Sequence, residues 1–157
     1  MHSNAKKVQE TLISLGYEAE VVEFSESTRT SQEAASAIGI SVAQIAKSMI
    51  FARGDAGVLV VTSGANRVST AKVAGLLGGE IGRADADMVR KLTGFPIGGV
   101  PPVAHVEGMD VLIDEDLTRF DEVWAAAGTP NAVFRTTPGA LIEMTGGRVA
   151  DIKEESR

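Results

Sequence analysis

Several residue types that often carry chemistry are scarce or absent in this chain of 157 residues. It has no cysteine, which excludes disulfides, thiolate metal ligands and cysteine nucleophiles. The two histidines, His2 and His105, stand far apart in the sequence, and this argues against a histidine-rich metal site. Aromatic residues make up only 4%, which argues against binding of single strands by base stacking. No apolar run approaches the roughly 18 residues of a membrane span.

Basic residues are also fewer than acidic ones, which gives a formal net charge of −6. A broad basic face that binds DNA or RNA is therefore not expected, although contact with one end of a nucleic acid is compatible with this charge. The polar N-terminal segment Met1 to Lys7 is unlike a secretory signal, so we expect a cytoplasmic protein. An apolar content of 44% and a charged content of 23% predict one globular domain over residues 1–157.

The hydrophobic pattern predicts helices and strands in irregular alternation. Helices are expected at Ala5–Leu15, at Ser31–Ile38, from Ser69 or Thr70 to Leu77, and at Ala86–Leu92 and Pro138–Met144, with a short helical turn at 42–46. The apolar face of the first helix is expected to contain Val8, Leu12 and Leu15, with Ile13 beside them. Thr30, Asp85 and Thr137 are expected to cap three of the helices, Thr30 in a reciprocal pair with Glu33. Strands are expected at Glu20–Phe24, Lys47–Ala52, Val58–Thr62, Asp110–Asp114, Phe120–Ala126 and Ala132–Arg135, with a closing strand or extended tail at Val149–Ile152. Because strand pairs joined by turns dominate, the fold class expected is α+β with a mixed, mainly antiparallel sheet and surrounding helices.

Lys47 stands at the start of a strand that the pattern predicts to be buried, opposite the apolar strand Val58–Thr62. Burying an ammonium group costs several kcal/mol unless it is paired. Lys47 is therefore a candidate functional residue. The alternative is a lysine whose side chain reaches solvent at the end of the strand.

The segment Gly94–His105 contains Gly98-Gly99-Val100-Pro101-Pro102, which no regular helix or central strand accommodates. Glycines permit close backbone approach, and prolines fix an extended backbone without N–H donors. Shaped loops of this kind often bind ligands, but the loop could equally be a rigid connection. His105, which follows it, could act as an acid or base, donate to a ligand, or satisfy backbone groups beneath the loop.

The familiar catalytic and nucleotide-binding motifs do not occur. No Rossmann or Walker fingerprint surrounds the glycines, and no Gly-x-Ser-x-Gly elbow is present. Six carboxylates fall at strand ends and turns, where we expect a solvated surface: Asp110, Asp114, Glu115, Asp116, Asp121 and Glu122. The residues alone therefore predict a small domain with a shaped loop and an unusual lysine.

Four segments in order resemble the YbaK/ProX family of free-standing aminoacyl-tRNA deacylases, which is related to the editing domain of bacterial prolyl-tRNA synthetase. They are residues 30–35 (TSQEAA), 44–51 (QIAKSMIF), 98–105 (GGVPPVAH) and 127–131 (AGTPN). The similarity extends from about Glu20 to Ile152. The lysine before an apolar strand, combined with the downstream Gly-x-x-x-Pro loop, carries most of it.

The resemblance implies roles for individual residues. Lys47 matches the family's essential lysine and is the expected catalytic residue. The loop Gly98, Gly99, Val100, Pro101 and Pro102 matches the loop that holds the aminoacyl end of tRNA, where backbone N–H groups of Gly98 and Gly99 could stabilise an oxyanion. Gly128 and Thr129 match a loop that lines the same pocket, and His105, which matches only some branches of the family, is a further substrate-binding candidate.

The implied function is trans-editing: hydrolysis of mischarged aminoacyl-tRNA, especially tRNA for proline carrying Ala, Cys, Ser or Thr, without metal or cofactor. The expected partners are the acceptor end of aminoacyl-tRNA and prolyl-tRNA synthetase, with no membrane and no DNA. The acidic net charge then requires delivery by a synthetase or a local basic patch formed by Lys6, Lys7, Arg53, Arg67, Lys72, Arg90 and Lys91. A non-catalytic module that binds an aminoacyl group or nucleotide, and a hydrolase of free amino-acid esters, are the alternatives.

Overall fold

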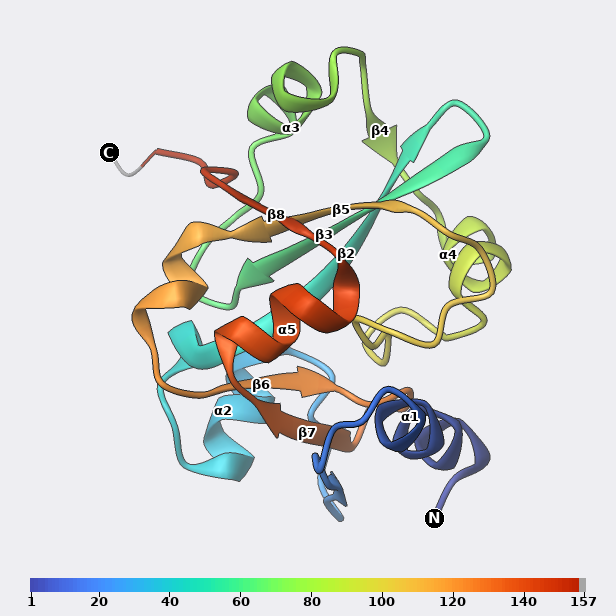
Figure 1. The fold of residues 1–157 in the computed structure, drawn as a ribbon, viewed down its shortest axis with the longest axis vertical. Helices are drawn as coiled ribbons and strands as arrows, with labels where there is room; N and C mark the ends of the chain where they lie inside the picture. Colours follow the sequence, from blue (N-terminus) through green and yellow to red (C-terminus); the bar gives the residue numbers. More distant parts are fainter. Residues whose placement is uncertain (156–157) are drawn as a thin grey trace.

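The computed structural model describes residues 1–155, with the helices and strands labelled in Figure 1. In chain order the elements are α1 (Ser3–Ser14), β1 (Val21–Glu23), α2 (Ser31–Ile38), the 3₁₀ turn η1 (Val42–Gln44), β2 (Ile45–Arg53), β3 (Ala56–Ser63), α3 (Thr70–Leu77), β4 (Gly82–Arg83), α4 (Ala86–Thr93), β5 (Asp110–Asp114), the 3₁₀ turn η2 (Glu115–Arg119), β6 (Val123–Ala126), β7 (Ala132–Thr136), α5 (Pro138–Thr145) and β8 (Arg148–Ala150).

The strands form one mixed sheet in the order β1-β7-β6-β2-β3-β5-β8, and β4 pairs separately with β2. Within residues 1–155 four of the seven pairings are antiparallel, namely β1–β7, β6–β7, β2–β3 and β2–β4. The pairings β2–β6, β3–β5 and β5–β8 are parallel. The expected α+β class with a mixed, mainly antiparallel sheet is therefore confirmed.

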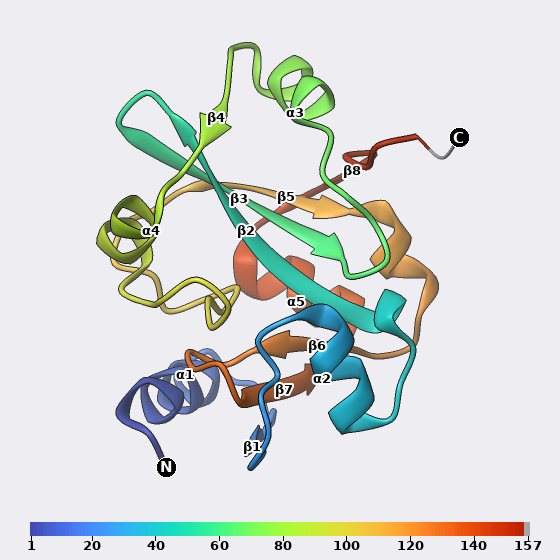
Figure 2. The ribbon, with the colours of Figure 1, turned by 180° about the vertical axis from the view of Figure 1, so that it is seen from behind.

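The central strand β3 is buried on both faces, as its apolar sequence predicts. Leu59 and Val61 enter the larger core cluster, which also contains residues of α1 and α5. Val58 and Val60 enter a second cluster with Val73 of α3. Helix α5 covers one face of the sheet in Figure 1, and α2 lies on the opposite face in Figure 2. No helix within residues 1–155 combines the length and the apolar character needed to cross a bilayer.

The helices begin and end largely where the sequence predicts. Side-chain oxygens of the capping residues accept a hydrogen bond from the backbone N–H three residues on, which satisfies one of the free donors of the first turn; these residues are Thr30, Ser69, Asp85 and Thr137. The reciprocal pair expected at Thr30 and Glu33 occurs instead at Ser41 and Gln44.

Two expectations about the elements need correction, and one strand was not expected. Ile13 and Leu15, expected on the apolar face of α1, are 62% and 49% exposed, because α1 packs through Ala5, Val8 and Leu12. The strand expected from Phe120 begins only at Val123, because residues 120 and 121 form a bend between the end of η2 at Arg119 and the strand. The two-residue strand β4 was not expected, because so short a segment has no periodicity to detect.

One edge of β2 is interrupted, and this interruption positions the candidate site. Strand β6 pairs with β2 only at Ile45 and Ala46. Strand β4 pairs with the same edge of β2 only at Phe51 and Ala52. Residues 47–50 therefore have β3 on one side and no strand on the other within residues 1–155.

Candidate functional site

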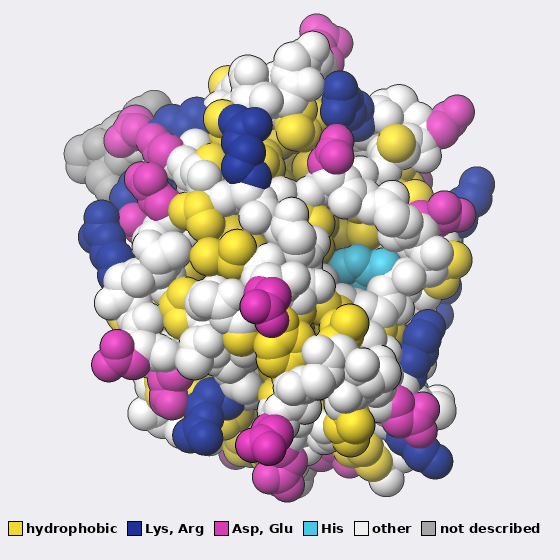
Figure 3. All heavy atoms as spheres, viewed as in Figure 1, with side chains coloured by type: hydrophobic (Ala, Val, Ile, Leu, Met, Phe, Trp, Pro, Cys, Tyr) yellow, Lys and Arg dark blue, Asp and Glu magenta, His cyan; other side chains and the backbone are white. Residues whose placement is uncertain are grey.

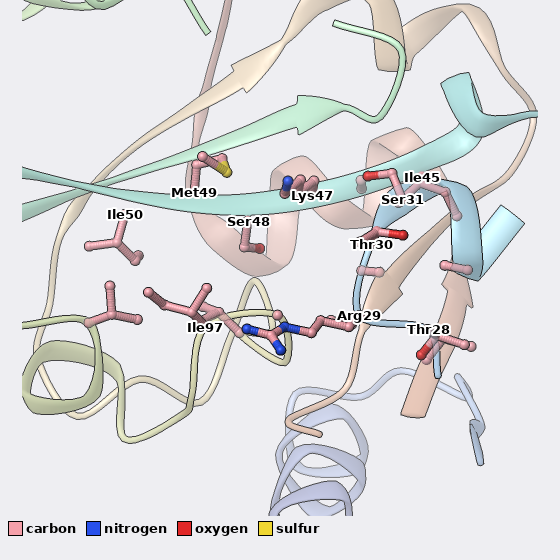
Figure 4. A pocket seen from close by; sticks show the side chains of 18 of the residues that line it. Thr28, Arg29, Thr30, Ser31, Ile45, Lys47, Ser48, Met49, Ile50 and Ile97 are labelled. Carbon is pink, nitrogen blue, oxygen red and sulfur yellow. The ribbon is translucent and has the colours of Figure 1, made fainter. Parts of the chain in front are cut away.

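A cavity of about 240 Å³ opens at the gap beside β2. Figure 4 shows β2 along one side, the segment around Ile97 across from it, and Thr28–Ser31 at the start of α2 closing one end. The lining thus comes from segments far apart in the sequence, which only the fold brings together.

Three cations line this cavity, and no carboxylate does. They are Arg29, Lys47 and Arg83, all exposed, and none takes part in an ion pair within residues 1–155. Elsewhere acidic and basic side chains are interspersed, as the face in Figure 3 illustrates. In a chain with a net charge of −6, this concentrated positive charge makes the cavity suited to an anionic ligand.

Lys47 lies in β2 opposite Thr62, as the sequence pattern predicted, but it is exposed. The expectation of a strand buried along its length was wrong for β2, because the sheet is interrupted at residues 47–50. The side chain therefore keeps its solvation while it borders a ligand-sized cavity, as Figure 4 shows.

The cavity also gathers polar groups that lack partners. Four buried side-chain polar atoms within residues 1–155 form no hydrogen bond, and three of them belong to cavity-lining residues: Ser31 Oγ, Ser48 Oγ and Trp124 Nε1. The fourth, Asp116 Oδ1, has the guanidinium of Arg119 at 3.3 Å. Unpaired buried polar groups are energetically costly. Their concentration in residues that line this cavity indicates a site where a polar ligand would supply the missing hydrogen bonds.

The loop Gly98–Pro102 meets the cavity through Gly98 and Val100, while Gly99, Pro101 and Pro102 lie outside its lining. Gly98 has a φ of +90°, and a Cβ there would approach Arg29 Cγ to 2.5 Å, so glycine is required. The expected donor Gly99 N–H is already occupied, because it donates to Pro96 O at 3.0 Å. Gly98 N–H and Val100 N–H have no partner within residues 1–155.

Gly128 and Thr129 support this loop from outside the cavity lining. Gly128 N–H donates to Gly99 O at 2.8 Å, and a Cβ on Gly99 would come within 3.0 Å of the Thr129 backbone. One residue further, Pro130 O accepts a hydrogen bond of 2.6 Å from the N–H of Thr28, which lines the cavity. The 128–130 segment thus joins two walls of the cavity.

His105 does not line the cavity. Its Nε2 lies 2.6 Å from Pro101 O, so the ring holds the backbone of the loop in place by a hydrogen bond. Burial lowers the pKa of His105 below its ordinary 6.5, an effect that the hydrogen bond to Pro101 partly opposes and the nearby Lys7 reinforces. The neutral ring is then the dominant form at pH 7, and Nε2 donates to the carbonyl.

The expected basic patch is already partly neutralised by acidic neighbours. Arg53 pairs with Asp110 at 3.3 Å, and Lys72 pairs with both Asp151 and Glu155. None of the seven residues proposed for the patch lines the cavity. The cations placed to meet a ligand are therefore Arg29, Lys47 and Arg83.

The expectation that all six carboxylates are solvated was wrong for Asp114, which is fully buried. Its Oδ2 accepts hydrogen bonds from Ser63 N–H and Asn66 Nδ2, both at 2.9 Å. The neighbouring Asp116 accepts from Lys153 Nζ at 2.7 Å, and this bond, with one from Asn66, lowers the pKa of Asp116. Within residues 1–155 no group of three or more His, Cys, Asp or Glu side chains could hold a metal ion.

Among the cavity residues that sequence reasoning missed are three polar ones with direct consequences for a ligand, Arg29, Ser48 and Arg83. Arg29 ends a polar loop, Ser48 adjoins the predicted lysine, and Arg83 belongs to a strand too short to predict. Only Ser48 carried a usable signal, since it is a polar residue within an otherwise apolar strand.

Known proteins resemble this chain over most of its length. A sequence profile described as "Aminoacyl-tRNA editing domain" matches residues 25–144. A solved structure named "putative trans-editing enzyme for prolyl tRNA synthetase" is 46% identical, with a TM-score of 0.95 and 99% of each chain covered. A solved hypothetical protein, APE2540, is 34% identical, with a TM-score of 0.88 over 94% of this chain and 99% of its own. The uncharacterized protein YwhH of Bacillus subtilis is 34% identical over 84% of this chain and 85% of its own length.

Proposed function

We propose that this chain, which belongs to the family of aminoacyl-tRNA editing domains, is a trans-editing hydrolase. Its substrate would be mischarged aminoacyl-tRNA, specifically tRNA for proline carrying a small wrong amino acid such as Ala, Cys, Ser or Thr. Prolyl-tRNA synthetase, which the name of one structural relative mentions, would be the partner that releases or delivers this tRNA. The protein would act in the cytoplasm, where translation takes place.

The observation that carries this proposal is the set of three cations around a cavity without carboxylates. The acceptor end of a tRNA brings phosphates and a ribose to the enzyme, and Arg and Lys side chains are the usual groups that bind phosphates. This arrangement allows an acidic protein to bind one end of a nucleic acid without a basic surface. Arg29, Lys47 and Arg83 would hold the terminal nucleotide while the aminoacyl group enters the cavity.

The reaction would be hydrolysis of the ester that links the amino acid to the terminal ribose. Water adds to the ester carbonyl, negative charge develops on the carbonyl oxygen, and the bond from carbon to the ribose oxygen then breaks. The products are the free amino acid and tRNA with its ribose hydroxyl restored. The N–H groups of Gly98 and Val100 are the available donors for the developing oxyanion, since Gly99 N–H is engaged within the loop.

The water would be oriented by the substrate itself. No Asp, Glu, His or Tyr lines the cavity, so a side-chain general base is not at hand. The free hydroxyl of the terminal ribose, adjacent to the ester, would position the water and take part in the proton transfer, with Lys47 orienting the ribose. The Pro101–Pro102 pair and the hydrogen bond from Gly128 to Gly99 would keep the donors in place throughout.

The test is release of labelled amino acid from a panel of Ala-, Cys-, Ser- and Thr-tRNA for proline. We expect substoichiometric protein to release the amino acid repeatedly from at least one member of the panel. Lys47→Ala should lower kcat/KM at least about 100-fold while changing the free energy of unfolding by less than about 0.5 kcal/mol. Lys6→Ala, which removes an exposed lysine of α1 outside the cavity, is the matched control.

Protection of the ester without turnover would instead support a non-catalytic binding module, which the absence of a side-chain base in the cavity also favours. Full activity in a folded Lys47→Ala protein would contradict the proposed role of this lysine. Release from free amino-acid esters, undiminished by competing tRNA, would point to a hydrolase of small esters.

A further inference from the structure

The unpaired edge of β2 presents backbone groups to the cavity at Ser48 and Ile50. Ile45 O accepts a hydrogen bond from Gly64 N–H at 2.8 Å, so the backbone groups of Ile45 face β3. In an antiparallel strand successive residues direct these groups to opposite edges. Those of Lys47 therefore face β3, and those of Ser48 and Ile50 face the interrupted edge, where no strand within residues 1–155 pairs with them.

The side chain of Ser48 adds a further polar group at the same place. Figure 4 shows it leaving β2 toward the opposite wall around Ile97 and Arg29. Its Oγ is inaccessible to solvent and forms no hydrogen bond within residues 1–155. A buried hydroxyl without a partner is unfavourable, and a ligand group that pairs with it recovers that cost.

Ser48 Oγ is shielded from solvent, whereas the three cations that line the cavity, Arg29, Lys47 and Arg83, are exposed. The lining residues that belong to the core cluster or pack against it are apolar and include Ile50, Ala84, Val89 and Val100. A cavity of about 240 Å³ cannot admit the body of a tRNA, so only the aminoacyl group of a bound acceptor end can enter beside Ser48.

We infer that Ser48 Oγ is a specificity-determining group that binds a hydroxyl on the aminoacyl side chain. The site then prefers the serine and threonine esters over the alanine ester. This inference rests on the proposed function. A hydroxyl can both donate to and accept from Ser48 Oγ, whereas the methyl group of alanine leaves it unpaired. Sites that pair with a substrate hydroxyl reject the analogue that lacks it far more strongly than apolar sites reject a missing methyl group.

The experiment compares kcat/KM for Ser-, Thr- and Ala-tRNA for proline. We expect the wild-type protein to prefer at least one hydroxyl-bearing ester over the alanine ester by about tenfold or more. Ser48→Ala should lower kcat/KM for that ester about tenfold and leave the alanine ester within about twofold. Ser48→Cys, which is nearly the same size but pairs weakly, should move the ratio in the same direction. Ser36→Ala, an exposed serine of α2 outside the cavity, is the matched control.

Three results would overturn the inference. The first is a wild-type protein that cleaves the alanine ester as fast as the hydroxyl esters, which needs no variant to observe. The second is an equal loss of kcat/KM on all three esters in folded Ser48→Ala, which would mean that Ser48 contacts a part that all substrates share, such as the ribose. The third is no release from any ester, which would remove the proposed function together with this inference.

Discussion

Two polar regions of this molecule differ in whether their charged groups have partners within the protein. Around Asp114 a buried carboxylate and its neighbour Asp116 are matched by Ser63 N–H, Asn66 and Lys153, all at 2.7–2.9 Å. At the cavity beside β2, the three lining cations have no carboxylate partner, and buried polar atoms of three lining residues have no hydrogen bond within residues 1–155. The first region pairs its charged groups with one another and with neighbouring donors, and the second leaves its cations for a ligand.

This difference separates residues that hold the fold from residues that serve function. Asp114 joins the ends of β3 and β5 through Ser63, and Asp116 joins η2 to the C-terminal segment through Lys153, so their partners are fixed by the fold. Arg29, Lys47 and Arg83 contribute nothing comparable, because each lines a cavity that the chain does not fill and none pairs with a carboxylate within residues 1–155. Substitutions in the two regions should therefore change different quantities.

The largest effect is expected from Asp114→Ala, which removes the buried acceptor and leaves its donors unpaired. We expect the free energy of unfolding to fall by about 3 kcal/mol, measured by urea denaturation. Asp110→Ala is the control, because the exposed pair of Asp110 with Arg53 should contribute less than about 0.5 kcal/mol. If Asp114→Ala lowered the free energy of unfolding by less than about 1 kcal/mol, the buried cluster around Asp114 would contribute no more to stability than an exposed ion pair does.

Reversing a cavity charge should leave stability intact and weaken binding. Arg83→Glu is expected to lower the affinity for an acceptor-stem minihelix about tenfold at low salt, with the difference shrinking as salt is added. The free energy of unfolding should change by less than about 0.5 kcal/mol. Arg67→Glu, an exposed arginine outside the cavity, controls for overall charge. If both variants lowered the affinity for the minihelix equally, the effect would come from the overall charge of the protein and not from a local cation site.

The smallest effect on stability is expected at His105. This residue shares features of both regions, because it supports the cavity loop by a hydrogen bond but does not line the cavity. Burial lowers its pKa below 6.5, so folding favours the neutral ring. The stability it contributes is complete above pH 6.5 and is lost as pH falls toward its lowered pKa. Between pH 7.5 and 5 the wild type should lose up to about 1 kcal/mol more than His105→Gln. The same unfolding measurements on His2→Gln, at the exposed start of α1, provide the control, and identical pH profiles for wild type and His105→Gln would contradict the assignment.

Local sequence patterns predicted much of the fold because they act over a few residues. The capping residues Thr30, Ser69, Asp85 and Thr137 began helices where expected. The alternating and continuous apolar runs placed β3 and β5 within one or two residues. The same patterns could not show that β2 loses its neighbour at residues 47–50, because that pairing depends on β4 and β6, which lie far from β2 in the sequence. That is why the strand that begins at Lys47 was expected to be buried, while for Lys47 itself a side chain that reaches solvent at the strand end stayed an alternative.

The candidate site divides in the same way. The lysine and the Gly-x-x-x-Pro loop were recognisable as motifs, and two loop positions, Gly98 and Val100, meet Lys47 at one cavity. The roles of Gly99, Gly128 and His105 as supports of that loop follow from hydrogen bonds between segments that no local pattern relates. The burial of Asp114 was equally hidden, since an acidic residue at a strand end usually lies on the surface.

The sequence by itself determined the absence of thiol chemistry, the order and type of most helices and strands, and the family whose motifs the chain carries. Only the tertiary structure decided which charges remain unpaired and which buried polar atoms lack a hydrogen-bond partner among residues 1–155. The physical reason is range: caps, turns and periodicity are set by neighbours along the chain, whereas solvation and pairing of Arg29, Lys47, Ser48 and Arg83 depend on walls contributed by distant strands and loops.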